Sequence, residues 1–337
     1  MNRRARIAVL MVLVVVLGGG ALGYVLLARS APEPALPAGS SPPTVAPSAV
    51  ADAPHVVFRN ATLGADLGRI ALSPLDDPGG PRALTDLTCD RVFAAAGRTL
   101  CVSSEPGLVT TYRATVHDDI TGERIELPLT GSPSRARLSR DGMLAATTSF
   151  VAGDSYAATT FSTRTVITDL ATGKSADLET FTLVDGGEEV RPVDRNYWGV
   201  TFAADGDRFY VTVAFGGRTH LGQGRLSTGT VTTVRTDAEC PSLSPDETRV
   251  AYKKRGDRPR GDWRIVVLDL ATGEETELAE TRSVDDQVEW LDDGRVIYGL
   301  PGEGSDAAQT NVWVVPADGT GSPEVLIPNA WSPAVVR

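Results

Sequence analysis

Residues 237–278 contain four short segments with the composition of β-strands, and this unit constrains the fold more than any other feature of the chain. The segments are residues 240–243, 248–253, 264–270 and 275–278. The third, RIVVLDL, is rich in β-branched residues, as expected of a buried strand. The tight turn Ala271-Thr272-Gly273 leads from it into the fourth. Four consecutive strands joined in this way are typical of one blade of a β-propeller.

The Thr-Gly turn of this unit recurs along most of the chain. It is found at residues 121–122, 172–173, 228–229, 272–273 and 320–321, and the sequence Asp-Pro-Gly-Gly at residues 77–80 occupies the same place upstream. The interval between these turns is close to the roughly 40–50 residues of a propeller blade. We therefore expect six outer hairpins.

Turns between the first and second strands of the blades repeat as well. They are predicted at Gly97 and at residues 141–142, 205–206, 246–247 and 293–294, so the first blade lacks an inner strand. Residues 332–336 (SPAVV) resemble residues 132–136 (SPSRA), which begin another blade. We expect this C-terminal segment to pair with the first blade and close the ring without an open edge. The prediction is an all-β, six-bladed propeller with blades at residues 55–86 plus 332–336, 87–130, 131–180, 181–236, 237–279 and 280–329.

The first thirty residues are predicted to be a membrane segment. Residues 7–28 carry no charge and follow Arg3, Arg4 and Arg6. A helix of this length crosses a bilayer core of about 30 Å, and the arginines predict a cytoplasmic N-terminus with the rest outside. A cleaved signal peptide ending near residues 28–31 is the alternative, although the long apolar run favours an uncleaved, single-pass anchor in the cell membrane.

Residues 31–54 contain seven prolines among small residues. Such a segment cannot bury a core and is expected to be an extended, semi-rigid linker. The predicted organisation is therefore an anchor at residues 1–30, a linker at 31–54 and a propeller at 55–337.

The charge of the chain limits its partners. The formal net charge is −11 at pH 7, although the first thirty residues contribute four arginines and no acid. Nucleic acids and anionic membrane surfaces are bound by basic faces. The propeller is therefore not expected to bind either.

Three segments resemble the repeats of TolB-type propellers, the periplasmic component of the Tol translocation system. They are LSPDETRVAYKK (243–254), VVLDLATGEETEL (266–278) and NVWVVPADGTG (311–321). The resemblance covers residues 55–337 and implies a protein-binding propeller, which in TolB binds a peptidoglycan-associated lipoprotein. TolB itself has an α/β domain before its propeller, whereas this chain has the apolar segment and the linker there. It is therefore more similar to membrane-anchored TolB-like proteins.

The lengths of the connections predict which face of the propeller binds. Connections between second and third strands are long at residues 103–109, 151–162, 254–262 and 301–310, whereas most other joints within blades are tight turns on the opposite face. Binding residues favour long loops on a rigid scaffold. The residues expected at the channel mouth on this face are Arg135, Arg137, Asn196, Tyr197, Trp198, Glu239, Asp285, Asp286, Gln287 and Trp331. We expect them to bind a partner, with packing between blades as the alternative role.

One long loop is basic in an otherwise acidic chain. Residues 253–262 read KKRGDRPRGD, and their basic side chains are Lys253, Lys254, Arg255, Arg258 and Arg260. A basic loop on an acidic protein can steer an acidic partner. A solvated loop without function is the alternative.

The three cysteines predict one disulfide outside the cytoplasm. Cys89 and Cys101 flank one inner hairpin, which places them close enough to pair, and Cys240 is then a buried free thiol. A bridge between Cys89 and Cys240 is the alternative.

No catalytic, metal or cofactor site is expected. His55, His117 and His220 lie in different blades, without the spacing of zinc ligands. Asp285 and Asp286 are adjacent in an extended segment and point apart, although with Glu289 they could bind calcium or act as acids. The sequence favours a monomeric, non-enzymatic, membrane-tethered propeller that binds a protein or cell-envelope component. A propeller enzyme acting on envelope glycan and a sensor of a small ligand or calcium are the alternatives.

Overall fold

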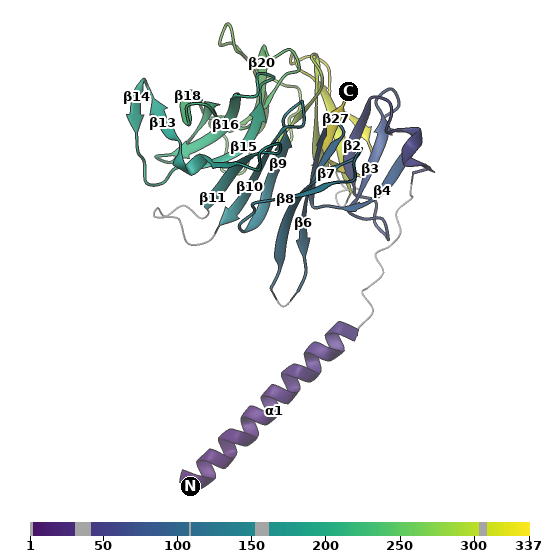
Figure 1. Cartoon of the computed structure of the whole chain (residues 1–337), viewed down its shortest axis with the longest axis vertical. Helices are drawn as coiled ribbons and strands as arrows, with labels where there is room; N and C mark the ends of the chain where they lie inside the picture. The colour runs from purple at the N-terminus through teal and green to yellow at the C-terminus, as the bar shows by residue number, and fades with distance from the viewer. Residues whose placement is uncertain (1–2, 31–41, 108, 152–161, 303–308) are drawn as a thin grey trace. The chain divides into compact units, whose positions relative to one another are not determined.

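The computed structural model describes residues 3–30, 42–107, 109–151, 162–302 and 309–337 (Figure 1). The chain divides into two compact units, residues 1–39 and 40–337. The first contains α1 (Arg3–Ser30), whose side chains are described only in part. No helix among the described residues is long and apolar enough to cross a membrane. The membrane anchor therefore stays a prediction.

The second unit is built from six β-sheets, which are the blades (Figure 1). Three of them, written from the inner to the outer strand, are β27 (Ala330–Val336), β2 (His55–Asn60), β3 (Arg69–Pro74) and β4 (Arg82–Thr88); β5 (Arg91–Ala95), β6 (Arg98–Glu105), β7 (Thr111–Asp118) and β8 (Arg124–Leu127); and β9 (Ser132–Leu138), β10 (Leu144–Val151), β11 (Ser162–Asp169) and β12 (Ser175–Asp177). The four strands of each are antiparallel.

The other three blades follow in chain order. They are β15 (Asn196–Phe202), β16 (Arg208–Phe215), β17 (Arg218–Arg225) and β18 (Thr230–Thr236); β19 (Glu239–Leu243), β20 (Arg249–Lys254), β21 (Arg264–Asp269) and β22 (Glu275–Glu277); and β23 (Glu289–Asp292), β24 (Arg295–Pro301), β25 (Thr310–Pro316) and β26 (Glu324–Ile327). The six-bladed all-β propeller predicted from the sequence is confirmed.

The ring closes as the sequence predicted. The C-terminal strand β27, yellow in Figure 1, pairs antiparallel with β2, with Val336 opposite His55 and Ala330 opposite Asn60. The first blade thus takes its inner strand from the other end of the chain. This pairing uses the backbone groups that an open propeller would leave exposed on two edges.

Six clusters of buried hydrophobic side chains lie between neighbouring blades in the described part of the chain. The alternation of side chains along a strand explains how one blade fills two interfaces. In the blade of β20 and β21, Ala251 and Val267 pack toward the next blade, whereas Tyr252 and Val266 pack toward the previous one. Because both faces of each sheet are buried, the blades hold their inner strands in fixed positions around the channel.

The repeated Thr-Gly turns are held by an aspartate at the end of the third strand. In the blade of β21, the Asp269 carboxylate accepts hydrogen bonds from the backbone N–H groups of Ala271 and Thr272, and Gly273 has a φ of 74°. These bonds to Thr272 and Ala271 lower the pKa of Asp269. The same bonds recur at Asp118 and Asp169. The aspartates of the repeat therefore stabilise turns and do not form a site.

Two additions at the outer edges of blades were not predicted. The hairpin of β13 (Thr182–Asp185) and β14 (Glu188–Val190) extends one blade to six strands, with β13 parallel to β18. β1 (Thr44–Val45) pairs parallel with β4 and is followed by η1 (Pro47–Ala49) and the buried Val50. The end of the segment that composition assigned to the linker, residues 31–54, is therefore part of the first blade.

The disulfide prediction is confirmed. Cys89 and Cys101 are bonded, with their Cα atoms 5.5 Å apart. Cys240 is free and buried at the start of β19. The alternative bridge between Cys89 and Cys240 is wrong.

Candidate functional site

The inner strands of all blades run in the same direction along the channel, so they begin at one end of it and finish at the other. The long loops and the connections between blades lie where the inner strands begin, and we call this the loop end. The tight turns lie where the inner strands finish, which we call the turn end. The channel contains a cavity at each end.

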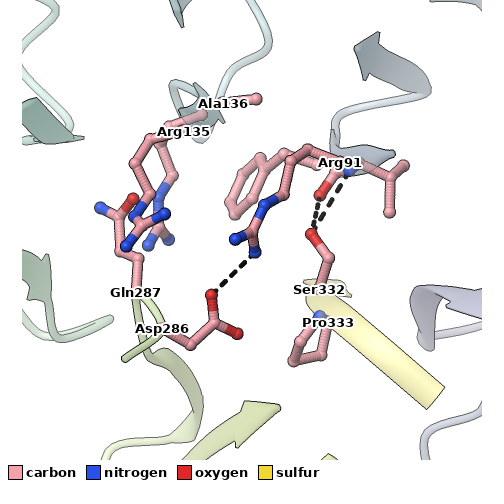
Figure 2. A pocket seen from close by; sticks show the side chains of 10 residues that line it. Arg91, Arg135, Ala136, Asp286, Gln287, Ser332 and Pro333 are labelled. Carbon is pink, nitrogen blue, oxygen red and sulfur yellow. Dashed lines mark hydrogen bonds and ion pairs between the residues drawn. The ribbon is translucent and has the colours of Figure 1, made fainter. Parts of the chain in front are cut away.

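The cavity at the loop end is small, about 30 Å³, which is room for little more than a water molecule. Polar side chains from three inner strands and from the segment before β23 surround it (Figure 2). We call this set the loop-end mouth: Arg91, Arg135, Asp286, Gln287 and Ser332. Four of its neighbours, Glu239, Lys253, Trp263 and Asp285, continue the polar surface outward.

An ion pair crosses the loop-end mouth. Arg91 Nη1 lies 2.9 Å from Asp286 Oδ1, and the two side chains point toward one another in Figure 2. Only 4% of the Asp286 side chain is exposed, and its other oxygen accepts a hydrogen bond from the Gly299 backbone. The Arg91 guanidinium also lies 5.4 Å from the centre of the Trp331 ring. The pair therefore joins three blades through charge and stacking.

A second group of charges surrounds Lys253. Its Nζ lies 2.6 Å from Asp285 Oδ1 and 4.3 Å from the centre of the Trp263 ring. Only 3% of the Lys253 side chain is exposed. Burial acts to lower the pKa of Lys253, but Cys240 and the two neighbouring carboxylates outweigh it and raise the pKa. The ammonium therefore stays charged beneath Asp285, whose side chain is 65% exposed.

The structure brings together most, but not all, of the residues predicted for the mouth. Arg135 lies 3.6 Å from Asp285, and Gln287 donates to the backbone oxygens of Val200 and Pro241. Glu239 accepts a hydrogen bond from the Trp263 indole.

Three predicted residues of β15 do not line this cavity. Tyr197 is fully buried in an interface between blades, and Trp198 is 9% exposed. Asn196 accepts a hydrogen bond from the Thr163 backbone. Packing between blades, the alternative role that the sequence left open, is seen for Tyr197.

Sequence reasoning missed Arg91 and Ser332. Both lie near the start of inner strands, Arg91 in β5 and Ser332 in β27, and both line the same cavity as Arg135 of β9. Counting back along β5 from the turn at Gly97 would have placed Arg91 at the mouth, because it begins this inner strand. Ser332 exchanges hydrogen bonds with the backbone of Val92 (Figure 2).

The predicted basic loop divides into two parts. Lys253 lies beside the mouth, whereas Lys254 pairs with Glu275 and Arg258 with Glu277 on the outer strand β22. Arg255 and Arg260 are exposed. Of the other long loops predicted on this face, residues 152–161 and 303–308 lie outside the described residues, and residues 103–105 belong to β6.

An ion pair in the middle of the channel separates the two cavities. Arg137 pairs with Glu289 and also donates to the backbone oxygen of Val288. Its guanidinium lies 4.6 Å from the centre of the Phe93 ring. The exposed fractions of the Arg137 and Glu289 side chains are 8% and 12%. Burial raises the pKa of Glu289 more than the neighbouring Arg137 lowers it.

The cavity at the turn end is much larger, about 240 Å³. We call it the turn-end vestibule, and all six inner strands or the turns that follow them contribute to its walls. Three arginines and one glutamate line it, together with aromatic and aliphatic side chains that include Phe93, Phe202, Leu243, Trp290 and Val335. The larger cavity therefore lies on the face with the tight turns, opposite the face that the connection lengths predicted to bind.

The carboxylates of the channel are not arranged as a catalytic or metal-binding set. Asp285 contacts Lys253, whereas the adjacent Asp286 contacts Arg91, so the two side chains engage different cations. Among the described residues, no group of three or more histidine, cysteine, aspartate or glutamate side chains could hold a metal ion.

Neither a protein-family model nor a curated protein sequence matches the chain. Among solved structures it is similar to TolB from Acinetobacter baumannii, with 18% identity and a TM-score of 0.57, over 84% of this chain and 66% of that one. The domain is therefore similar in fold to the TolB β-propeller. A TolB from Agrobacterium tumefaciens is 10% identical with a TM-score of 0.50, over 82% of this chain and 89% of that one.

A chain of a nidogen/laminin complex has the same fold. It is 11% identical, with a TM-score of 0.54 over 84% of this chain and 98% of that one. These likenesses confirm the resemblance that the repeats predicted, and they concern the fold. This chain covers just under two thirds of the Acinetobacter TolB.

Proposed function

We propose that the propeller is a non-enzymatic binding domain that captures a protein or cell-envelope component at its loop-end mouth. The observation that supports this most is the convergence of polar side chains from four blades on one small opening, with Lys253 of a fifth blade beside it. The rigid sheets fix these groups in position before binding, which lowers the entropy cost of forming an interface.

The charges at the mouth define the chemistry of the partner. Arg135 and Lys253 stand beside Asp285, whose side chain is 65% exposed, and the exposed Arg255 and Arg260 lie in the basic loop that begins at Lys253. An acidic loop or peptide could replace Asp285 as the partner of these cations. Electrostatic complementarity of this kind speeds encounter and gives specificity.

The proposed location is the extracytoplasmic side of a membrane. The disulfide between Cys89 and Cys101 fits an oxidising compartment. The charge-free residues 7–28, preceded by three arginines, fit a single-pass anchor. In this arrangement the propeller is tethered and reaches a partner in the cell envelope.

Site-specific photo-crosslinking in intact cells tests the proposal. A photoreactive residue at Arg260 lies at the loop end, and a matched one at Glu274 lies in an exposed turn of the same blade at the turn end. We expect a reproducible adduct from position 260 that is absent from position 274. Asp285→Lys should strengthen the adduct, because it removes the competing carboxylate and places a further cation where the partner's acid would bind. Equal adducts at both positions, or none at position 260, would contradict the proposal.

A further inference from the structure

The turn-end vestibule has the size and the lining of a ligand site. Its volume of about 240 Å³ exceeds the roughly 150 Å³ of an engineered cavity that holds benzene. Phe202, Trp290 and Leu243 supply apolar walls. The Trp290 indole donates a hydrogen bond of 2.9 Å to the Ser242 backbone, which fixes the ring. A small organic molecule therefore fits where the loop-end cavity admits only water.

The vestibule is positively charged in a protein whose net charge is −11. Its ionisable side chains are Arg137, Arg140, Arg337 and Glu289. Glu289 pairs with Arg137, which leaves Arg140 and Arg337 in excess. Within the described ranges, no ion pair joins either of these two arginines to an acidic side chain. A cavity with this balance attracts anions and repels calcium or other cations.

Backbone carbonyl groups hold the two unpaired arginines at the rim of the cavity. Arg140 Nη1 donates to the Pro245 oxygen at 2.8 Å, in the turn between β19 and β20. Arg337 Nη2 donates to the Leu291 oxygen at 2.8 Å and to the Trp290 oxygen at 3.1 Å. Each guanidinium has five N–H donors, so both retain donors for a ligand after these bonds are made. The carbonyls orient the arginines without neutralising them.

We propose that the turn-end vestibule binds a small organic anion, with its carboxylate or phosphate group held by Arg140 and Arg337 and its apolar part against Phe202 and Trp290. Guanidinium groups bind both oxyanions through paired, charge-assisted hydrogen bonds. The apolar walls distinguish an organic anion from an inorganic one. This site is separate from the loop-end mouth, since the pair of Arg137 and Glu289 lies between them.

Calorimetric titration of the full chain in detergent tests this proposal, with three probes of matched size or charge. Phenyl phosphate combines both parts of the proposed ligand, inorganic phosphate lacks the ring, and benzyl alcohol lacks the charge. We expect phenyl phosphate to bind more tightly than inorganic phosphate and benzyl alcohol not to bind. Benzyl alcohol binding as tightly as phenyl phosphate, or no binding of either anion, would overturn the proposal.

Three variants locate the site. Arg140→Gln and Arg337→Gln should each weaken phenyl phosphate binding about tenfold or more, the loss expected for a charge-assisted hydrogen bond. Arg140→Lys should retain part of the affinity because it retains the charge. Arg124→Gln, a matched change at an exposed arginine of the outer strand β8, should leave binding unchanged. Unchanged affinity in both Arg140→Gln and Arg337→Gln would show that the anion binds elsewhere. Because the crosslinking experiment probes the other end of the channel, its outcome is independent of this one.

Discussion

The two ends of the channel use arginine in opposite ways. At the loop-end mouth, Arg91 pairs with Asp286, and 4% of that aspartate side chain is exposed. At the turn-end vestibule, Arg140 and Arg337 donate to backbone carbonyls and face a cavity about eight times larger, 240 against 30 Å³. A charge that is paired and buried holds blades together, whereas a charge that is oriented but unpaired can bind a ligand. Four predictions test this difference.

The largest effect is expected at the ion pair between the two cavities. Arg137→Met leaves the Glu289 carboxylate buried without its partner, and removing one member of a buried ion pair costs about 3–5 kcal/mol. Burial already raises the pKa of Glu289 in the native protein. The measurement is the free energy of unfolding from urea denaturation.

A double variant distinguishes the lost pair from lost packing. Arg137→Met combined with Glu289→Met removes both charges and should recover most of the stability, since apolar replacement of a buried pair is often neutral or stabilising. A double variant as unstable as the single one would show that the pair acts through shape alone. In that case the boundary between mouth and vestibule would be one of packing and not of charge.

The next effect is expected at the loop-end mouth. Arg91→Met leaves Asp286 with the Gly299 N–H as its remaining hydrogen-bond donor, and a buried group that loses its partner costs about 1–3 kcal/mol. The matched change Asp285→Asn, at a side chain that is 65% exposed, should cost less, because water screens an exposed charge and Glu239 remains 4.0 Å from Lys253 Nζ. Equal losses in urea unfolding would mean that burial does not separate these neighbouring carboxylates.

Much of this architecture could be predicted because the relevant signals are local and repeated. In four of the five Thr-Gly turns an aspartate and the glycine lie within five residues of one another, so the sequence predicts the turn directly. The spacing of Cys89 and Cys101 across one hairpin gave the disulfide for the same reason. After six such units were placed in series, the first blade lacked an inner strand, and the C-terminal segment that forms β27 was the one that could supply it.

The membership of the mouth could be predicted less well, because irregular backbone decides which side chains face the channel. The pairing of β15 with β16 shifts between Trp198 and Thr201, where Gly199 has a φ of 69°. A shift of one residue moves side chains to the opposite face of a strand. Counting from the turns therefore placed Tyr197 at the opening, although it packs between blades. The vestibule was missed because turn length says nothing about the volume that inner side chains leave.

The pH dependence of stability tests the environment of Glu289, which faces Arg137, Arg140 and Arg337. Its pKa is raised in the folded protein, so the folded state binds its proton more tightly than the unfolded state does. The resulting stabilisation is complete below the ordinary pKa of a glutamate, about 4.3, and is lost as the pH rises through the folded-state value. Glu289→Gln cannot titrate. The stability of the native chain relative to this variant should therefore fall as the pH rises above about 4.3. An increase over that range would mean that the three arginines outweigh burial.

The smallest effect is expected at the rim of the vestibule. Arg140→Gln removes an exposed guanidinium that has no carboxylate partner among the described residues. Its loss leaves the Pro245 oxygen near solvent, and changes at such surface positions usually stay within about 0.5 kcal/mol. Urea unfolding of this variant beside Arg91→Met compares an unpaired with a paired arginine at the two ends of one channel. If Arg140→Gln cost as much as Arg91→Met, Arg140 would be a structural residue like Arg91. Near-native stability together with lost phenyl phosphate binding would instead show that the vestibule arginines are positioned for a ligand.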